Sequence, residues 1–340
     1  MYAQVSLADR NGLVIAETNA LIESATWRLN GVGMAKLWLA WSDDNCTQEK
    51  LAFGNVALIQ FNNGLPLWGG VIDPPRRRVH GSVGITAYSG ERLLDWRVTA
   101  KSRAFNSTPP GQIFQSLIEE ENAEYPTGVE IGTIYAGGTG RSIEYHYHDL
   151  LRRIMDLTRL TGNEFAVLPE LAAGRVSFKA HWYERRGQDK RNTTWFLDGR
   201  NVGEATMDEQ GTLANQIWLA GSGSTWGSER LTADDASVAS RDAYRYREYA
   251  EVQAGVTVQE TLDANAAELL AQKAYPQNVF SISATNKAPG LFASYDVGDI
   301  VTAKLFQDSP EWAVSATVRV VAREVRSDGS CGLEVVEWTD

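Results

Sequence analysis

The sequence predicts a mainly β protein of antiparallel strands with an inserted region that mixes helices and strands. Aromatic residues are numerous, with eleven Trp, twelve Tyr and ten Phe among 340 residues, and they favour the half-buried faces of sheets. Four Asn-Gly or Asp-Gly pairs stand between plausible strands, and such pairs favour the tight turns of β hairpins. The chain is too long for one ordinary core, so two or three packed domains are expected.

Residues 1–100 are predicted to form a first β domain, a barrel or a sandwich. Around Asn30-Gly31, the alternate residues Ala25, Trp27 and Leu29 would face one side of the hairpin. The run at 56–61 pairs naturally with 67–73. The hairpin pairs are Asn11-Gly12, Asn30-Gly31, Asn63-Gly64 and, near the other end of the chain, Asp328-Gly329.

Residues 101–200 are predicted to form a smaller α+β insertion. A helix is expected from Thr108-Pro109-Pro110 to about Glu121, because Thr suits the N-cap and Pro suits the first turn. A second helix is expected at 147–160, where leucines and Ile154 form an apolar stripe and Gly162 suits the position after the helix. Alternation at 176–182 predicts a strand.

Residues 201–340 are predicted to form a second β domain with one helix. A polar stretch, Gly221 to Ser224, interrupts its first strands. The helix is expected at 262–273, with Pro276 just beyond its end. Further strands are expected at 279–284, 300–305, 314–325 and 333–338.

Two β segments share one plan. Gly54-Asn55 opens a strand that turns into a returning strand at 68–72, and Gly298-Asp299 opens a strand that turns into another at 314–321. The chain would then carry two related antiparallel, barrel-like β domains, although convergence of simple hairpins gives the same pattern. If the domains are related, three chains would supply six similar units to a ring.

The bulk composition argues against several classes of protein. The net charge is −11 with a pI of about 5.0, whereas a protein that grips nucleic acid more often carries a basic surface. The two cysteines, Cys46 and Cys331, make neither a disulfide framework nor a metal knuckle. The start of the chain does not resemble a signal peptide, and no stretch reaches the ~18 apolar residues of a membrane helix.

No catalytic, cofactor-binding or metal-binding residue is predicted. Among His80, His146, His148 and His181, the pair His146 and His148 would share a face on a strand and could bind a metal with Glu144 or Asp149. No further ligand stands at a recognisable spacing, so a polar junction between a strand and a helix is the preferred interpretation.

Other candidate motifs have ordinary structural explanations. Glu119-Glu120-Glu121 is expected to be a solvated face at a helix end, and Ser89 lacks the glycine context of a nucleophile. Gly137 to Arg141 lacks the Lys-Ser/Thr of a phosphate loop. Arg76-Arg77-Arg78 could contact phosphate or an acidic partner, or be a solvated hairpin end. Core packing accounts better than sugar binding for the tryptophans at several of positions 27, 38, 68, 96, 182 and 218.

Taken together, these segments resemble the trimeric hub proteins of phage tail tips and baseplates, a family that includes the N-terminal parts of tail-associated lysins. The resemblance covers nearly the whole chain. It departs where Asp235-Ala236-Ser237 is followed by Tyr244-Arg245-Tyr246 without the family's glycine. The similar segments are Ala25 to Leu29, Gly54 to Ile59, Trp68 to Ile72, Tyr88 to Asp95, Leu160 to Val167 and Tyr295 to Val301.

The resemblance implies a homotrimeric structural protein of the virion, made in the host cytoplasm and located at the tail tip. Its expected partners are the distal tail protein, the tail tube protein, the tape measure protein and a tip or fibre protein, with DNA passing through without specific binding. Because the chain ends at Asp340, soon after the last barrel, we expect a minimal hub. Two alternatives are a virion-associated cell-wall hydrolase and a glycan-binding receptor protein.

Overall fold

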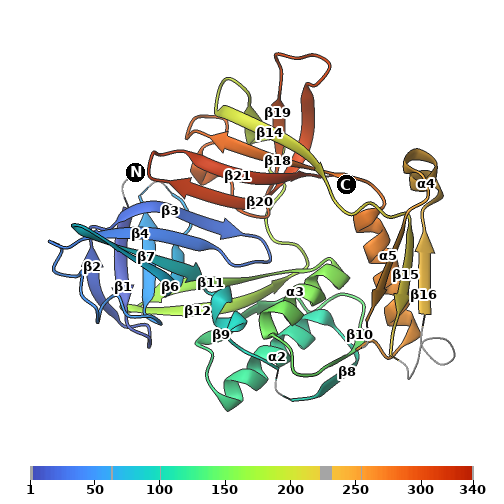
Figure 1. The fold of residues 1–340 in the computed structure, drawn as a ribbon, viewed down its shortest axis with the longest axis horizontal. Coiled ribbons are helices and arrows are strands. Elements are labelled where there is room, and N and C mark those ends of the chain that lie inside the picture. Colours follow the sequence, from blue (N-terminus) through green and yellow to red (C-terminus); the bar gives the residue numbers. More distant parts are fainter. Residues whose placement is uncertain (1–2, 63, 100, 223–231, 254, 339–340) are drawn as a thin grey trace.

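The computed structural model describes residues 3–62, 64–99, 101–222, 232–253 and 255–338 (Figure 1). Asn63 of the third predicted hairpin, and Gly223 and Ser224 of the predicted polar stretch, lie outside the described residues. Strands dominate the described chain. The prediction of a mainly β fold with a helix-containing insertion is confirmed.

One 13-stranded sheet contains strands from both ends of the chain. We call the two groups of strands the first and second β units. The first β unit consists of β1 (Ala3–Ala8), β2 (Val14–Thr18), β3 (Leu21–Arg28), β4 (Met34–Ala40), β5 (Val56–Phe61), β6 (Trp68–Val79) and β7 (Ser82–Ser89). The second β unit consists of β13 (Trp195–Leu197), β14 (Val202–Gln210), β18 (Gln277–Ala284), β19 (Ile300–Leu305), β20 (Val314–Arg326) and β21 (Cys331–Glu337). A 3-10 turn, η1 (Phe292–Ser294), precedes β19.

The predicted hairpins form where their turn residues stand. β1 pairs with β2, β3 with β4, and β20 with β21, all antiparallel. Gly12, Asn30 and Gly329 adopt φ values of 82°, 50° and 82°, which tight hairpin turns require. β5 and β6 also pair antiparallel on either side of residues 63–64.

The main sheet is open rather than a closed barrel. Its path runs from β14 to β2, and no barrel closes among the described strands. The reason lies in β3, which pairs with β4 on one edge and with β20 of the second unit on the other. The two β units are therefore joined edge to edge (Figure 1), and one hydrophobic cluster contains buried residues from both.

The middle domain lies between the two β units in sequence and contains both predicted helices. Leu150–Thr161 ends at Gly162, whose φ of 68° and N–H bond to the Thr158 carbonyl form the predicted C-terminal cap. The rings of Phe114 and Trp182 lie 5.0 Å apart, so α2 (Pro110–Glu124) packs against β12 (Arg175–Tyr183). The elements are α1 (Glu91–Asp95), β8 (Arg103–Thr108), α2 (Pro110–Glu124), β9 (Val129–Ile134), β10 (Arg141–Tyr145), α3 (Leu150–Thr161), β11 (Glu164–Ala172) and β12 (Arg175–Tyr183).

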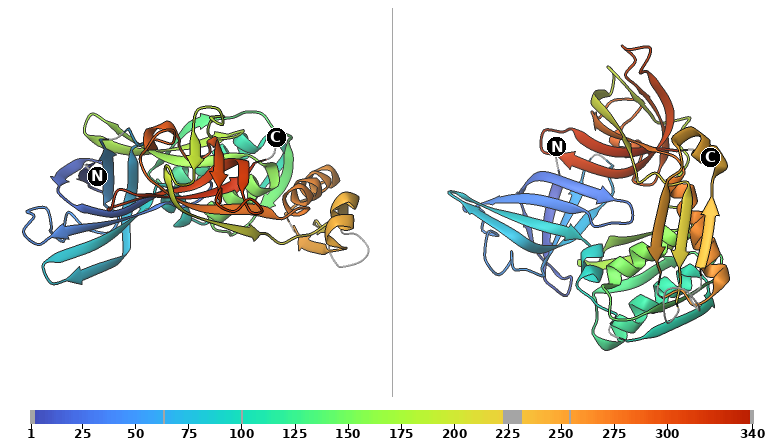
Figure 2. Two further views of the ribbon diagram at one scale, coloured as in Figure 1. Left: turned by 90° about the horizontal axis from the view of Figure 1, so that it is seen from above. Right: turned by 45° about the vertical axis from the view of Figure 1, so that its right-hand side comes forward.

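A small unit interrupts the second β unit between β14 and β18. The predicted third helix, α5 (Gln259–Lys273), covers the sheet of this unit and buries Leu262 and Leu269 against Ile217, in a hydrophobic cluster of its own. Figure 2 shows this unit at the end of the molecule away from the first β unit. Its elements are β15 (Gln216–Ala220), β16 (Thr232–Ala236), α4 (Val238–Tyr244), β17 (Glu248–Val252) and α5 (Gln259–Lys273). The sequence patterns do not predict the short helices α1 and α4.

Candidate assembly surface

The first β unit contains a closed backbone link between the turn before β5 and the strand β6. The Gly54 N–H donates to the Ile72 carbonyl at 2.9 Å, and the Ile72 N–H donates to the Asn55 carbonyl at 2.7 Å. Gly54 has a φ of 88°, a conformation that glycine adopts without steric cost. The turn is thereby fixed to the long strand before β5 begins.

The second β unit repeats this link. The Gly298 N–H donates to the Val320 carbonyl at 2.7 Å, and the Val320 N–H donates to the Asp299 carbonyl at 3.0 Å. Gly298 has a φ of 97°. The repeated plan predicted from Gly54-Asn55 and Gly298-Asp299 is therefore confirmed at the level of backbone hydrogen bonds.

An arginine on each long strand reaches back to the loop before the link. The Arg76 guanidinium donates to the Leu51 carbonyl and lies 4.5 Å from the centroid of the Phe53 ring. The Arg323 guanidinium donates to the Tyr295 carbonyl at 2.7 Å and the Phe292 carbonyl at 2.6 Å. Arg76 is half-buried, whereas Arg323 is fully buried.

The side chains that support the two links differ in charge. The Asn55 amide nitrogen donates to the Glu49 and Lys50 carbonyls at 3.0 and 3.1 Å. The Asp299 carboxylate instead accepts from the Gln188 N–H at 2.7 Å and from the Lys190 ammonium at 2.8 Å. Asn55 and Asp299 are both buried, so each needs these partners.

The junction of β3 and β20 covers Arg323. Arg323 lies opposite Trp27 in the register, and its guanidinium lies 5.9 Å from the centroid of the Trp27 ring. The pairing continues through Glu324 opposite Thr26 and Val325 opposite Ala25. The arginine is thus enclosed where the edge of one β unit meets the next.

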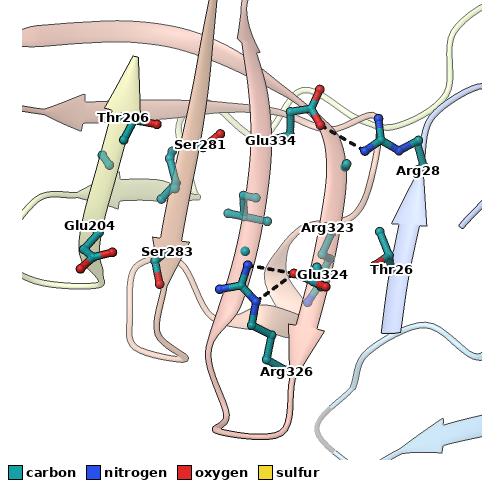
Figure 3. A pocket seen from close by; sticks show the side chains of 15 residues that line it. Thr26, Arg28, Glu204, Thr206, Ser281, Ser283, Arg323, Glu324, Arg326 and Glu334 are labelled. Atoms are coloured by element: carbon teal, nitrogen blue, oxygen red, sulfur yellow. Dashed lines mark hydrogen bonds and ion pairs between the residues drawn. The ribbon is translucent and has the colours of Figure 1, made fainter. Parts of the chain in front are cut away.

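A shallow groove of about 440 Å³ crosses this junction (Figure 3). Arg28 of β3 and Glu334 of β21 form an ion pair of 3.3 Å, and Arg326 pairs with Glu324 at 2.8 Å. The rest of its polar lining consists mainly of short hydroxyl side chains, such as Ser281. This lining is suited to a wetted, charge-balanced surface rather than to an apolar ligand pocket.

A buried ion pair attaches the second β unit to the middle domain. Arg319 of β20 and Glu164 of β11 lie 2.5 Å apart and are 6% and 5% exposed. The Arg186 N–H donates to the same carboxylate at 2.6 Å. The local sequence patterns do not identify this pair. The available signal was Arg319 between Val318 and Val320, a charged residue inside an apolar run.

The predicted histidine pair lies in the loop between β10 and α3, not on a strand. The His146 imidazole lies 3.2 Å from the Glu144 carboxylate. Burial lowers the pKa of His148, and the positive charge of Arg153 lowers it further. Among the described residues, no group of three or more His, Cys, Asp or Glu side chains could hold a metal ion. Both histidines thus lie between the end of β10 and the start of α3.

The acidic run and Ser89 have structural partners. Glu119-Glu120-Glu121 lies inside α2, which continues to Glu124, so its predicted position at the helix end is wrong. Glu120 and Glu121 pair with arginines at 103 and 97. The Ser89 hydroxyl donates to the buried Glu91 carboxylate and accepts from the Gly33 N–H. Burial raises the pKa of Glu91, and the Ser89 hydroxyl opposes that rise.

The remaining candidates divide between core and surface. Trp27, Trp68 and Trp182 are buried, as predicted for core residues, whereas Trp96 and Trp218 are 44% and 45% exposed. Cys46 and Cys331 are both free thiols. The segment from Gly137 lies between β9 and β10, and the Arg141 guanidinium at its end donates to the Leu160 carbonyl. The arginines at 76–78 lie on β6, and the last two are exposed.

The described helices do not combine the length and apolar character that a membrane span requires. No protein-family model matches the sequence. No curated protein matches it either.

Solved structures of phage tail proteins share the whole fold. The prophage tail protein gp18 of Listeria monocytogenes EGD-e is 14% identical, with a TM-score of 0.61 over 98% of this chain and 94% of that one. The 43 kDa tail protein of prophage MuSo2 from Shewanella oneidensis is 14% identical, with a TM-score of 0.60 over 98% of each chain. A chain of the p2 virion baseplate is 8% identical, with a TM-score of 0.51 over the full length of both. The chain therefore has the fold of the phage tail and baseplate proteins that its sequence resembles.

Proposed function

We propose that this protein is a structural hub at the distal end of a bacteriophage tail. In this proposal, three copies form a ring that joins the sixfold tail tube to the tip or fibre and closes or gates the channel. The observation that carries the proposal is the pair of β units with the same backbone link, joined edge to edge by β3 and β20. Three copies with two such units each present six similar surfaces to a sixfold tube.

The parts of the chain have separate roles in this proposal. Residues 1–100 and 201–340 supply the two hub domains, and residues 101–200 form the insertion outside the ring. The distal tail protein and the tail tube protein bind on one side, and a tip or fibre protein binds on the other. The ring retains the tape measure protein and DNA until the host is recognised. A net charge of −11 suits a channel that DNA passes without binding.

We propose a mechanical role without catalysis. Two of the three carboxylates that line the groove, Glu324 and Glu334, each pair with an arginine, and the third, Glu204, is exposed. This arrangement does not supply the free pair of acid and base that hydrolysis of glycans needs. Incubation of the purified protein with host cell-wall polymer tests this point. Release of soluble fragments, abolished by His148→Ala or by replacement of one acidic residue, would establish the hydrolase alternative. Saturable glycan binding lost on Trp218→Ala would establish the receptor alternative.

The mass of the purified protein in solution tests the ring. Light scattering after size exclusion, alone and with the tail tube protein, should give a trimer or a ring with three copies per tube end. A monomer that does not bind tail components contradicts the proposed hub function.

A further inference from the structure

The first β unit leaves one edge of β6 without a partner strand. β5 pairs with β6 only from Trp68 to Val71, and among the described strands none covers that edge at 76–79. In the second β unit, the matching edge of β20 is occupied, because β3 pairs there from Arg326 to Ala322. The internal junction therefore indicates what kind of partner the free edge of β6 accepts, which is a strand equivalent to β3.

The strand equivalent to β3 in the second unit is β14, which lies at the far end of the sheet. Rows of residues paired across each unit establish this correspondence. The row in the first unit is Ala25, Ala35, Ala87 and Ile72. The row in the second unit is Met207, Phe280, Val335 and Val320. Ile72 and Val320 are the residues that bond to the Gly-Asn and Gly-Asp links, so Met207 occupies the place of Ala25.

The arginines on the two long strands correspond in the same way. Arg76 lies opposite Ile85 of β7, and Arg323 lies opposite Leu333 of β21. Ile85 stands two positions before Ala87, and Leu333 stands two positions before Val335, which are the residues of β7 and β21 in the two rows. Both guanidinium groups also donate to the carbonyl four positions before the Asn or Asp of the link. Arg76 therefore occupies the place of Arg323.

We propose that β6 of one copy pairs antiparallel with β14 of the next copy, in the register of the internal β20–β3 junction. Arg323 lies opposite Trp27, and Glu324 opposite Thr26. Transferred to the free edges, this register sets Arg76 opposite Glu209 and Arg77 opposite Asp208. The inference rests on the proposed ring and specifies how its copies meet.

Charge complementarity supports a second copy as the occupant. The free edge of β6 presents three consecutive arginines, of which Arg77 and Arg78 are exposed. The free edge of β14 presents the exposed acids Asp208 and Glu209. Opposite charges directly across a strand pair are favourable, and like charges are unfavourable. The proposed register therefore neutralises both edges and disfavours β6 pairing with another β6.

The grooves of the two units support the same arrangement. The groove at the internal junction has a volume of about 440 Å³ and includes Thr26 and Arg28 of β3 as one wall. The corresponding groove of the first unit, lined by Lys36, Arg77 and Thr86 among others, has a volume of about 190 Å³. The described residues that line it include none from a strand beyond β6, where β14 of the next copy would lie.

A charge exchange tests the pairing in the full chain. Arg77→Asp and Asp208→Arg should each raise the subunit dissociation constant on the order of 100-fold, since each sets like charges opposite one another. The double variant should recover to within about tenfold of the parent, because it restores the pair in reverse. Arg152→Asp, at an exposed position of α3, is the control for the change in net charge.

A cysteine pair tests the register independently. Arg78→Cys with Met207→Cys should form a disulfide between copies under mild oxidation, because the register sets these residues opposite one another. Arg78→Cys with Glu204→Cys should not, since three strand positions span about 10 Å. The pairing is overturned, but the proposed hub is not, if the ring forms normally, neither charge reversal changes its dissociation constant and no crosslink forms. A parent protein that stays monomeric with the tube protein overturns both.

Discussion

The two β units share a backbone link but differ in how it is supported. In the first unit, Asn55 donates to a carbonyl six positions away along the chain. In the second, Asp299 accepts from a backbone N–H 111 positions away and binds Lys190. A neutral amide is sufficient for a local loop, whereas the carboxylate attaches a distant segment that enters the second unit. The comparison shows one link used as a local turn and as a long-range anchor.

Arg76 and Arg323, which reach back to the loops before the two links, differ in how far they are enclosed at the edges of the units. Arg323 is enclosed by Trp27 and by the rings of Phe292 and Tyr295, with the Tyr295 centroid 4.6 Å away. Among the described residues, Phe53 is the only aromatic ring that lies against the Arg76 guanidinium. β3 of the first unit completes the enclosure of Arg323 in the second unit. The corresponding surroundings of Arg76 in the first unit contain no equivalent of β3 among the described strands.

The largest difference between the units should appear when each arginine is removed. Arg323→Ala should lower the free energy of unfolding by about 4 kcal/mol, because it leaves a cavity and two buried carbonyls without a donor. Arg76→Ala should cost about 1 kcal/mol or less in the monomer, since water replaces its lost contacts. Urea unfolding followed by tryptophan fluorescence measures both. Equal losses would show that the two sites are buried alike.

An exchange of the link residue should expose the different support of the first unit. Asn55→Asp should cost about 3 kcal/mol at pH 7, because a buried carboxylate would face the Glu49 and Lys50 carbonyls. Such surroundings raise the pKa of the introduced carboxyl in the folded state above its unfolded value of about 3.9. The folded variant then binds the extra proton, so its deficit should shrink as the pH falls towards roughly 4. A deficit that does not depend on pH would contradict this account.

The reverse exchange should have a smaller effect on the second unit. Asp299→Asn should cost about 2 kcal/mol, because it removes the charge opposite Lys190 and points an amide nitrogen at one of the backbone donors. Hydrogen exchange at Gln188 should increase together with the loss of stability. Lys190→Met is the matched control, since it removes the other half of the ion pair. Unchanged protection at Gln188 would show that the carboxylate does not hold this segment.

The sequence could predict those parts of the fold that depend on local chemistry. Asn30-Gly31 and Asp328-Gly329 require positive φ, and the stripe that includes Ile154 and ends before Gly162 requires a helix. The repeated link was visible because glycine and a short polar residue recur before similar strands. These signals lie within a few positions of one another along the chain.

The remainder of the fold and the assembly surface depended on contacts between distant segments. Arg28 and Glu334 are 306 positions apart, and nothing in either segment identifies its partner. The pairing of Arg319 with Glu164 likewise joins positions 155 apart. The barrel expectation failed for this reason, because alternation shows that a strand has an inner face but not which edge it meets.

The smallest effect should be equal in the two units, at the turns that end their long strands. Gly81, between β6 and β7, and Gly329, between β20 and β21, have φ values of 84° and 82°, and a Cβ at either would meet no atom within 4 Å. Gly81→Ala and Gly329→Ala should therefore each cost about 1 kcal/mol, from backbone conformation alone. Matched shifts in the urea midpoint would show that the hairpins are equivalent wherever no partner segment intervenes. A much larger loss at Gly329 would mean that contacts made by the second unit depend on its turn.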